Sequence, residues 1–151
     1  MLYFILMGAS VFTYFVTLAH VPETLVNAVG ALNLPPLLII FLLLIAYLVL
    51  GSVFEEISAI LITLPFVLPI VVHLGYDPVW WGVMNVIQVE LALIHPPLGV
   101  IVFLLHGIAP EIPMKTIYRG VVPFIVADLV VLLLLMLFPD IALWLPRLIG
   151  S

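Results

Sequence analysis

The chain has 151 residues, of which 67% are hydrophobic and 7% are charged, and its mean hydropathy is +1.50. Three basic and eight acidic residues are too few to cover the surface of a soluble globular domain, so the composition indicates an integral membrane protein. The net charge of −5 offers no basic patch for phosphates, which excludes nucleic acid as a partner.

Six apolar segments are expected along the chain, at about residues 2–19, 37–50, 57–74, 79–94, 98–105 and 121–138. The first is long enough to cross a bilayer, whereas a helix over residues 37–50 would measure about 21 Å, short of a hydrocarbon core of about 30 Å. We expect polar links at 20–33 and 106–120, and an interfacial tail from 139 to 151. The three tryptophans are predicted to anchor at the membrane interface, as aromatic-belt residues do: Trp80, Trp81 and Trp144.

Two clusters of polar and helix-breaking residues interrupt these apolar segments. One is Gly51-Ser-Val-Phe-Glu55-Glu56-Ile-Ser58, and the other runs from Glu90 to Gly99 and contains Pro96-Pro97. A carboxylate at the centre of a bilayer costs roughly 2.5–3.5 kcal/mol, so such groups usually line a path or a binding site. Two prolines remove two backbone donors, and the freed carbonyl oxygens then need protein, water or an ion as partners. The pattern therefore predicts a protein that handles a polar solute or an ion at membrane depth.

The segments around Gly51–Ser58 are open to two interpretations. In an ordinary helical hairpin, residues 35–54 would span the membrane, and Glu55 and Glu56 would lie at the headgroups. In a re-entrant hairpin, two helices would enter and leave by the same face and meet at a Gly-Ser tip inside the membrane. The Pro-Pro break that follows favours the second interpretation, because interrupted apolar segments are typical of transporter binding sites.

Several motifs also occur in a characteristic order. They are Gly51-Ser-Val-Phe-Glu55, Leu64-Pro-Phe-Val-Leu-Pro69-Ile, Leu74-Gly-Tyr-Asp-Pro78, Pro96-Pro97-Leu98-Gly99, Tyr118-Arg119-Gly120-Val-Val-Pro123-Phe124 and Phe138-Pro139-Asp-Ile-Ala-Leu-Trp144. Each motif is weak by itself, but the ordered set covers nearly the whole chain. As a set, they resemble the large membrane subunit of tripartite ATP-independent periplasmic (TRAP) transporters, the DctM-type permease.

The resemblance implies an all-α polytopic membrane protein that forms one half of a permease built from two inverted repeats. That half contains a re-entrant helical hairpin and a helix broken at a Pro-Pro pair. We expect residues 1–151 to form a single membrane domain, equivalent to the C-terminal half of the permease. The hairpin is expected at about 36–74, the broken helix at about 79–107 and the last span at about 121–138. The expected location is the bacterial inner membrane, with several membrane passes.

The resemblance further implies sodium-coupled import of a carboxylate of the C4-dicarboxylate or sugar-acid type, with Na⁺ as the coupling ion and no other cofactor. The implied partners are a periplasmic solute-binding protein, the small TRAP membrane subunit and the missing N-terminal repeat. Carried over by position, a cation site made partly of backbone oxygens would include Gly51, Ser52, Glu55, Ser58, Ala92, His95, Pro96, Pro97 and Gly99. The family usually has Gly in place of Ala92 and Thr in place of His95, and Asn is common where this chain has Ile101, so side chains would contribute less to sodium binding here.

Two further acids lie within apolar segments. Glu90 is predicted to pack against or hydrogen-bond to a neighbouring helix, and Asp128 to contact another helix or subunit. The sequence contains no His-Glu-x-x-His zinc motif and no Gly-x-Ser-x-Gly elbow, so neither catalysis nor a transition-metal site is expected. The alternative to a transporter is a non-transporting membrane interaction protein or a truncated permease remnant.

Overall fold

The computed structural model describes residues 2–53, 56–95 and 99–149, with the side chains of residues 2, 52, 53, 56 and 57 outside this description. Within these ranges the chain forms eight α-helices and no strand, which confirms the all-α class expected from the sequence. The helices are α1 (Leu2–Leu18), α2 (Val21–Ala31), α3 (Pro36–Val53), α4 (Glu56–His73), α5 (Pro78–Ile94), α6 (Val100–Ile108), α7 (Met114–Leu137) and α8 (Asp140–Ile149).

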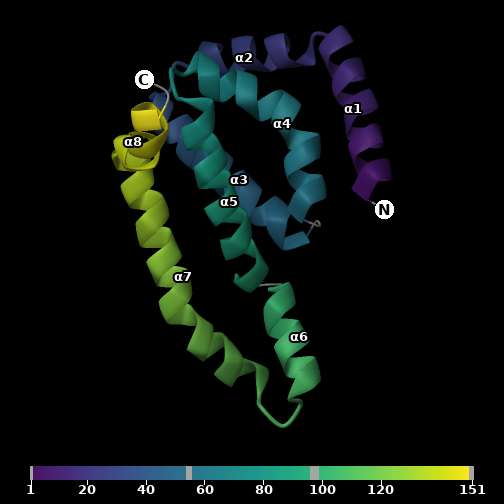
Figure 1. Ribbon diagram of the computed structural model, residues 1–151, viewed down its shortest axis with the longest axis vertical. Helices are drawn as coiled ribbons and strands as arrows, with labels where there is room; N and C mark the ends of the chain where they lie inside the picture. Colours follow the sequence, from purple (N-terminus) through teal and green to yellow (C-terminus); the bar gives the residue numbers. More distant parts are fainter. Residues whose placement is uncertain (1, 54–55, 96–98, 150–151) are drawn as a thin grey trace.

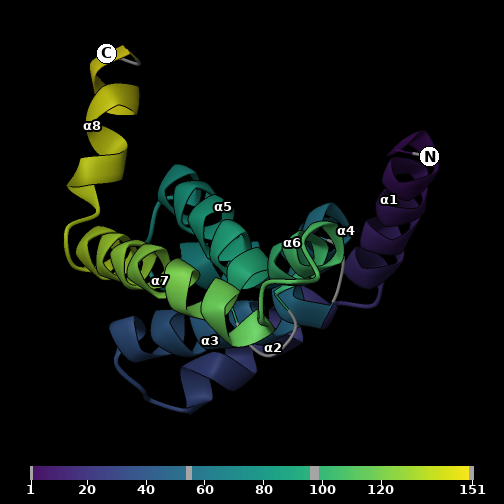
Figure 2. The ribbon, with the colours of Figure 1, turned by 90° about the horizontal axis from the view of Figure 1, so that it is seen from below.

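The arrangement centres on α5, which is followed end to end by α6 (Figure 1). The α3–α4 hairpin packs against α5, and α7 folds back along α6 and α5. Helices α1 and α2 pack on α4, whereas α8 projects from the far end of α7 (Figure 2). The hairpin and the end of α5 are therefore parts of one packed unit.

Residues 20–33, predicted as a polar link, instead contain the helix α2. It is bent by 62° from α1, and the turn is made at His20, whose φ of +52° is left-handed. Pro22 lies in the first turn of α2, where a missing N–H breaks no helical bond, and the Glu23 carboxylate lies at the positive end of the helix dipole. Both residues favour a helix start, and none of the α2 residues is buried, so their polarity costs little.

In the described part of the chain, one helix is long and apolar enough to cross a membrane by itself, the 24-residue α7. A second span results if α1 and α2 are counted together as one bent element. The 17 residues of α5 make a helix of about 25 Å, less than a hydrocarbon core of about 30 Å. Helix α7 begins at Met114, after Pro113, so residues 114–120 are helical and not part of a link.

The hydrophobic core lies where α3, α4 and α7 meet α5. Trp80 and Trp81 are 0% and 1% exposed, so the prediction that they anchor at the membrane interface was wrong. Their rings pack inward because α5 is buried along a broad face from its first turn, where Asp77 accepts a hydrogen bond of 2.7 Å from the Val79 N–H and caps the helix. By contrast, Trp144 on α8 is 66% exposed.

Candidate cation site at the helix break

The break between α5 and α6 is defined by the backbone at its two ends. His95 is extended (φ −78°, ψ 137°), and its N–H donates a bond of 3.0 Å to the Leu91 carbonyl, which closes the last turn of α5. At the start of α6, Gly99 adopts a left-handed conformation with φ +40°. The chain therefore leaves one helix and begins the next without a continuous hydrogen-bond ladder.

Gly99 is also required for space. A Cβ atom at this position would lie 3.3 Å from the Ile94 carbonyl oxygen, 3.3 Å from the Tyr118 hydroxyl and 3.4 Å from the His95 carbonyl oxygen. The two contacts at 3.3 Å are tighter than about nine in ten real Cβ contacts, so the neighbouring oxygen atoms would have to shift. The left-handed backbone and these close oxygen atoms together favour glycine at this position.

The two prolines leave carbonyl oxygens of α5 without their helical donors. In an α-helix, a carbonyl accepts from the N–H four residues later, and the residues four after Ala92 and Leu93 are Pro96 and Pro97. Proline carries no N–H, so this follows from covalent structure alone, although Pro96 and Pro97 lie outside the described residues. Free carbonyl oxygens at the negative end of a helix dipole favour a cation.

The α3–α4 hairpin reaches this part of α5 through Gly51. A Cβ atom at Gly51 would lie 2.8 Å from the Ala92 Cβ, closer than two such carbons can approach, so the helices meet here only because residue 51 is glycine. Ala92 is 1% exposed, and Gly51 is also buried. The hairpin and the broken helix, predicted from sequence to share a site, are thus in contact at these two residues.

The remaining predicted site residues fall into two groups. The Ser52 side chain and residues Glu55, Pro96 and Pro97 lie outside the described part of the structure. Ser58 borders a cavity whose other wall is formed by α1 residues, including Phe4 and Phe12, so this serine lies on the side of α4 that faces α1. The structure therefore brings together Gly51 with Ala92, and His95 with Gly99.

Tyr118 is the neighbour of this break that reasoning from sequence did not single out. It lies one turn into α7, and its hydroxyl oxygen is buried beside Gly99 without a hydrogen-bond partner among the described residues. The position follows from the turn between α6 and α7, which makes the two helices antiparallel neighbours (Figure 1). Tyr118 belongs to one of the motifs that carry the resemblance, but no sequence signal places it at the break, because its position depends on how α7 folds back.

Glu90 and Asp128 share a cavity of about 550 Å³ next to the break, between α5, α6 and α7. The same cavity is lined by Ile94 and by Ile101. Neither carboxylate has an ion pair or a hydrogen bond within the described residues. Glu90 is exposed on α5, and its packing against or hydrogen bond to a neighbouring helix stays a prediction.

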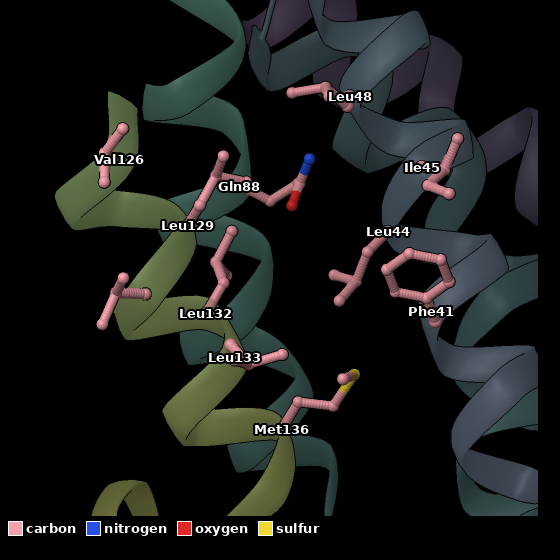
Figure 3. A pocket seen from close by; sticks show the side chains of 11 residues that line it. Phe41, Leu44, Ile45, Leu48, Gln88, Val126, Leu129, Leu132, Leu133 and Met136 are labelled. Carbon is pink, nitrogen blue, oxygen red and sulfur yellow. The ribbon is translucent and has the colours of Figure 1, made fainter. Parts of the chain in front are cut away.

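A second cavity, of about 370 Å³, lies between α3 and α7 (Figure 3). Its walls are formed by apolar side chains such as Leu44, Leu129 and Met136, and the amide of Gln88 points into it from α5. Gln88 is 3% exposed, so this amide is the main polar feature of an otherwise hydrocarbon surface.

Among the described residues, no group of three or more His, Cys, Asp or Glu side chains is placed to hold a metal ion. The oxygen atoms gathered at the break are instead neutral carbonyl and hydroxyl oxygens. Neutral oxygen donors suit a monovalent cation better than a transition metal, which prefers imidazole or thiolate ligands.

A comparison with protein families matches residues 1–141 to the DctM component of the tripartite ATP-independent periplasmic transporter. The chain belongs to this family. It is 32% identical over 142 residues to the sialic acid TRAP transporter large permease protein SiaM of Vibrio cholerae, an alignment that covers 94% of this chain and 33% of the relative. It is 31% identical over 150 residues to the C4-dicarboxylate TRAP transporter large permease protein DctM of Pseudomonas aeruginosa, covering 99% of this chain and 35% of the relative. It is 34% identical over 144 residues to the ectoine/5-hydroxyectoine TRAP transporter large permease protein UehC of Ruegeria pomeroyi, an alignment that covers 94% of this chain and 33% of the relative.

This DctM-family chain spans about a third of the length of the curated relatives it matches. The family consists of transporter permeases and not of enzymes, and its members are membrane proteins. The relatives are named for different solutes, so family membership by itself does not fix the substrate.

Proposed function

We propose that this chain forms part of a sodium-coupled secondary transporter that imports a carboxylate across the bacterial inner membrane. The observation that supports the proposal is the contact between Gly51 and Ala92, because Ala92 is one of the two residues whose carbonyl oxygens lose their helical donors to Pro96 and Pro97. Membership of the DctM family supports the transporter class. The sialic acid and C4-dicarboxylate relatives support an acidic substrate.

The proposed coupling uses the two polar ends of the broken helix. The C-terminal end of α5 presents carbonyl oxygens, which stabilise Na⁺, and the N-terminal end of α6 presents N–H groups, which stabilise a carboxylate. Because the two ends lie next to each other, bound Na⁺ would fix the geometry of the anion site and would offset its charge. Neither Ala92 on α5 nor Ile101 on α6 provides a side-chain oxygen, so the backbone would supply the ligands at these two positions.

The proposed assembly includes the partners typical of the family. A periplasmic binding protein would deliver the substrate, the small membrane subunit would brace the permease, and an N-terminal repeat would complete the substrate site. The chain would pass through the membrane several times, with α7 as the longest span. Co-purification of this chain with the small subunit tests that part of the proposal.

The first experiment is thermal unfolding of the purified chain in detergent, with NaCl compared with KCl at equal ionic strength. A ligand that binds only the folded state raises stability by about 2.7 kcal/mol at a hundred times its Kd, so Na⁺ should raise the unfolding midpoint and K⁺ should not. The measurement is repeated with the N-terminal repeat of a relative co-expressed. Equal midpoints in Na⁺ and K⁺ in both preparations would refute the sodium site.

A further inference from the structure

The structure assigns Tyr118 to the cation site: we propose that its hydroxyl oxygen binds the monovalent cation at the break, together with the carbonyl oxygens of Ile94 and His95. This inference rests on the proposed function and extends the site to a third element, α7. The three oxygen atoms lie within 3.3–3.4 Å of one point, the position that a Cβ of Gly99 would occupy. All three therefore lie around Gly99, and they are contributed by the end of α5 and the first part of α7.

The chemistry of the cluster favours a ligand and not a hydrogen bond within the protein. The Tyr118 hydroxyl is buried and has no hydrogen-bond partner in the described part of the chain, although two carbonyl oxygens lie nearby. Buried polar atoms of this kind are normally satisfied, and an orphan one points to a partner that the protein itself does not supply. All three groups provide neutral oxygen atoms, the type of ligand that a cation of low charge accepts, and the cation titration below separates such a cation from ordered water.

Through Tyr118, the proposed cation site is linked to helix α7 and to the hydrophobic core that α7 helps to form. Helix α7 is the longest helix and runs from the break to the packed core, where Leu132, Leu135 and Met136 are buried. A cation that binds both the end of α5 and the Tyr118 hydroxyl would hold α7 against the broken helix. Loss of the cation would release this contact without disturbing the Gly51–Ala92 contact on the opposite element, α3.

The test compares Tyr118→Phe with the wild-type chain in the two preparations described above, by thermal unfolding over a NaCl series balanced with KCl. Tyr118→Phe should need at least about tenfold more Na⁺ for half of the stabilisation, the range expected when a group that supports a metal site is lost. Its midpoint in KCl should be unchanged or higher, because the hydroxyl lacks a partner when no cation is bound. Tyr14→Phe is the matched control: Tyr14 is 68% exposed on α1, so its Na⁺ response should equal that of the wild type.

Three outcomes would overturn the inference. A wild-type Na⁺ response in Tyr118→Phe would exclude Tyr118 as a ligand and leave the proposed function intact. An equal drop of the midpoint in NaCl and KCl would assign the hydroxyl a purely structural role. No Na⁺ response in the wild type would refute the proposed sodium site and this inference together.

A spectroscopic measurement covers the case in which Tyr118→Phe does not fold. With 3-fluorotyrosine at position 118, the ¹⁹F resonance should move on addition of Na⁺ and not of K⁺, while the same label at position 14 should not respond. A label at 118 that is insensitive to Na⁺ in a chain that Na⁺ stabilises would overturn the inference.

Discussion

The indole nitrogen of Trp80 donates a hydrogen bond of 2.8 Å to the carbonyl oxygen of Leu135, 55 residues later in the chain. The residue four after Leu135 is Pro139, which has no N–H to offer that carbonyl within the helix. A side chain of α5 therefore supplies the hydrogen-bond donor that this carbonyl oxygen, near the end of α7, lacks within its own helix. The bond ties the start of the broken helix to the end of the longest helix.

Loss of the Trp80 bond is expected to destabilise the fold more than loss of its neighbour's indole. Trp81 is equally buried, but its Nε1 has no hydrogen-bond partner among the described residues, so Trp81→Phe removes similar volume without breaking a bond. Trp80→Phe should lower the unfolding free energy by about 1–3 kcal/mol more than Trp81→Phe, because it leaves the Leu135 carbonyl unpaired. Chemical denaturation of the two variants in the same detergent measures the difference, and equal losses would contradict the prediction.

The close approach of Gly51 to Ala92 predicts that substitutions at the two positions compensate each other when they are combined. Gly51→Ala should cost about 1–3 kcal/mol, because the added methyl group meets the Ala92 methyl and forces α3 away from α5. Combining it with Ala92→Gly should recover most of that loss, apart from about 1 kcal/mol for glycine within a helix. Unfolding midpoints of the wild type, the two single variants and the double variant form the complete cycle. A double variant as unstable as Gly51→Ala would show that the two residues do not meet.

Gly99 and Gly120 should respond in opposite directions to the same substitution. Gly99→Ala should destabilise by about 1–2 kcal/mol, the cost of a left-handed L-residue, and should also reduce any Na⁺-dependent stabilisation, because the new methyl displaces oxygen atoms at the break. Gly120→Ala, in α7 with open space around it, should stabilise by about 0.5–1 kcal/mol. Thermal unfolding with and without Na⁺ checks both. A Gly99→Ala chain that keeps the stability and Na⁺ response of the wild type would refute the geometry of the break.

Asn85 is expected to be a site where loss of polarity stabilises the protein. It is 4% exposed, and its amide makes no hydrogen bond of good geometry within the described residues, although its side chain lies near the Tyr47 hydroxyl. Asn85→Leu should therefore raise the unfolding free energy by about 1 kcal/mol or more, as expected when an unsatisfied buried amide is replaced by a side chain of similar size. Denaturant unfolding measures this. A fall in stability would show instead that the Tyr47 hydroxyl or ordered water satisfies the amide and makes it part of the fold.

Sequence reasoning located the helix break and the hairpin because glycine and proline act locally. Two adjacent prolines remove two successive helical N–H donors, whereas the single prolines Pro65, Pro69 and Pro123 lie inside continuous helices. Gly51 marks a close approach that a side chain would prevent without a shift of α3. The contact between Gly51 and Ala92 supports the expectation that hairpin and break are neighbours. These features depend on backbone chemistry, which a single sequence states directly.

The sequence predicted less well which side of each helix faces the protein core, because most of the helices are apolar around their whole circumference. A helix without a polar face gives no amphipathic pattern, so the sequence did not distinguish the buried Trp80 from a membrane-interface anchor. Tyr118 was missed for a related reason, since its position at the break depends on the turn that returns α7 toward α5. The polar residues between 20 and 33 predict a link between helices, but an exposed helix such as α2 tolerates the same residues, so the sequence did not reveal this helix.

The prolines at 96 and 97 also determine how the broken helix can be studied. The carbonyl oxygens that they leave free belong to the peptide chain itself, so no exchange of amino acid removes them. In an alanine scan across this break, Pro96→Ala and Pro97→Ala would return an N–H donor to these oxygens, and the other substitutions would leave the oxygens unchanged. Ester replacement through chemical synthesis is the complementary change, because it weakens a chosen carbonyl acceptor, removes the N–H of the following residue and leaves every side chain in place.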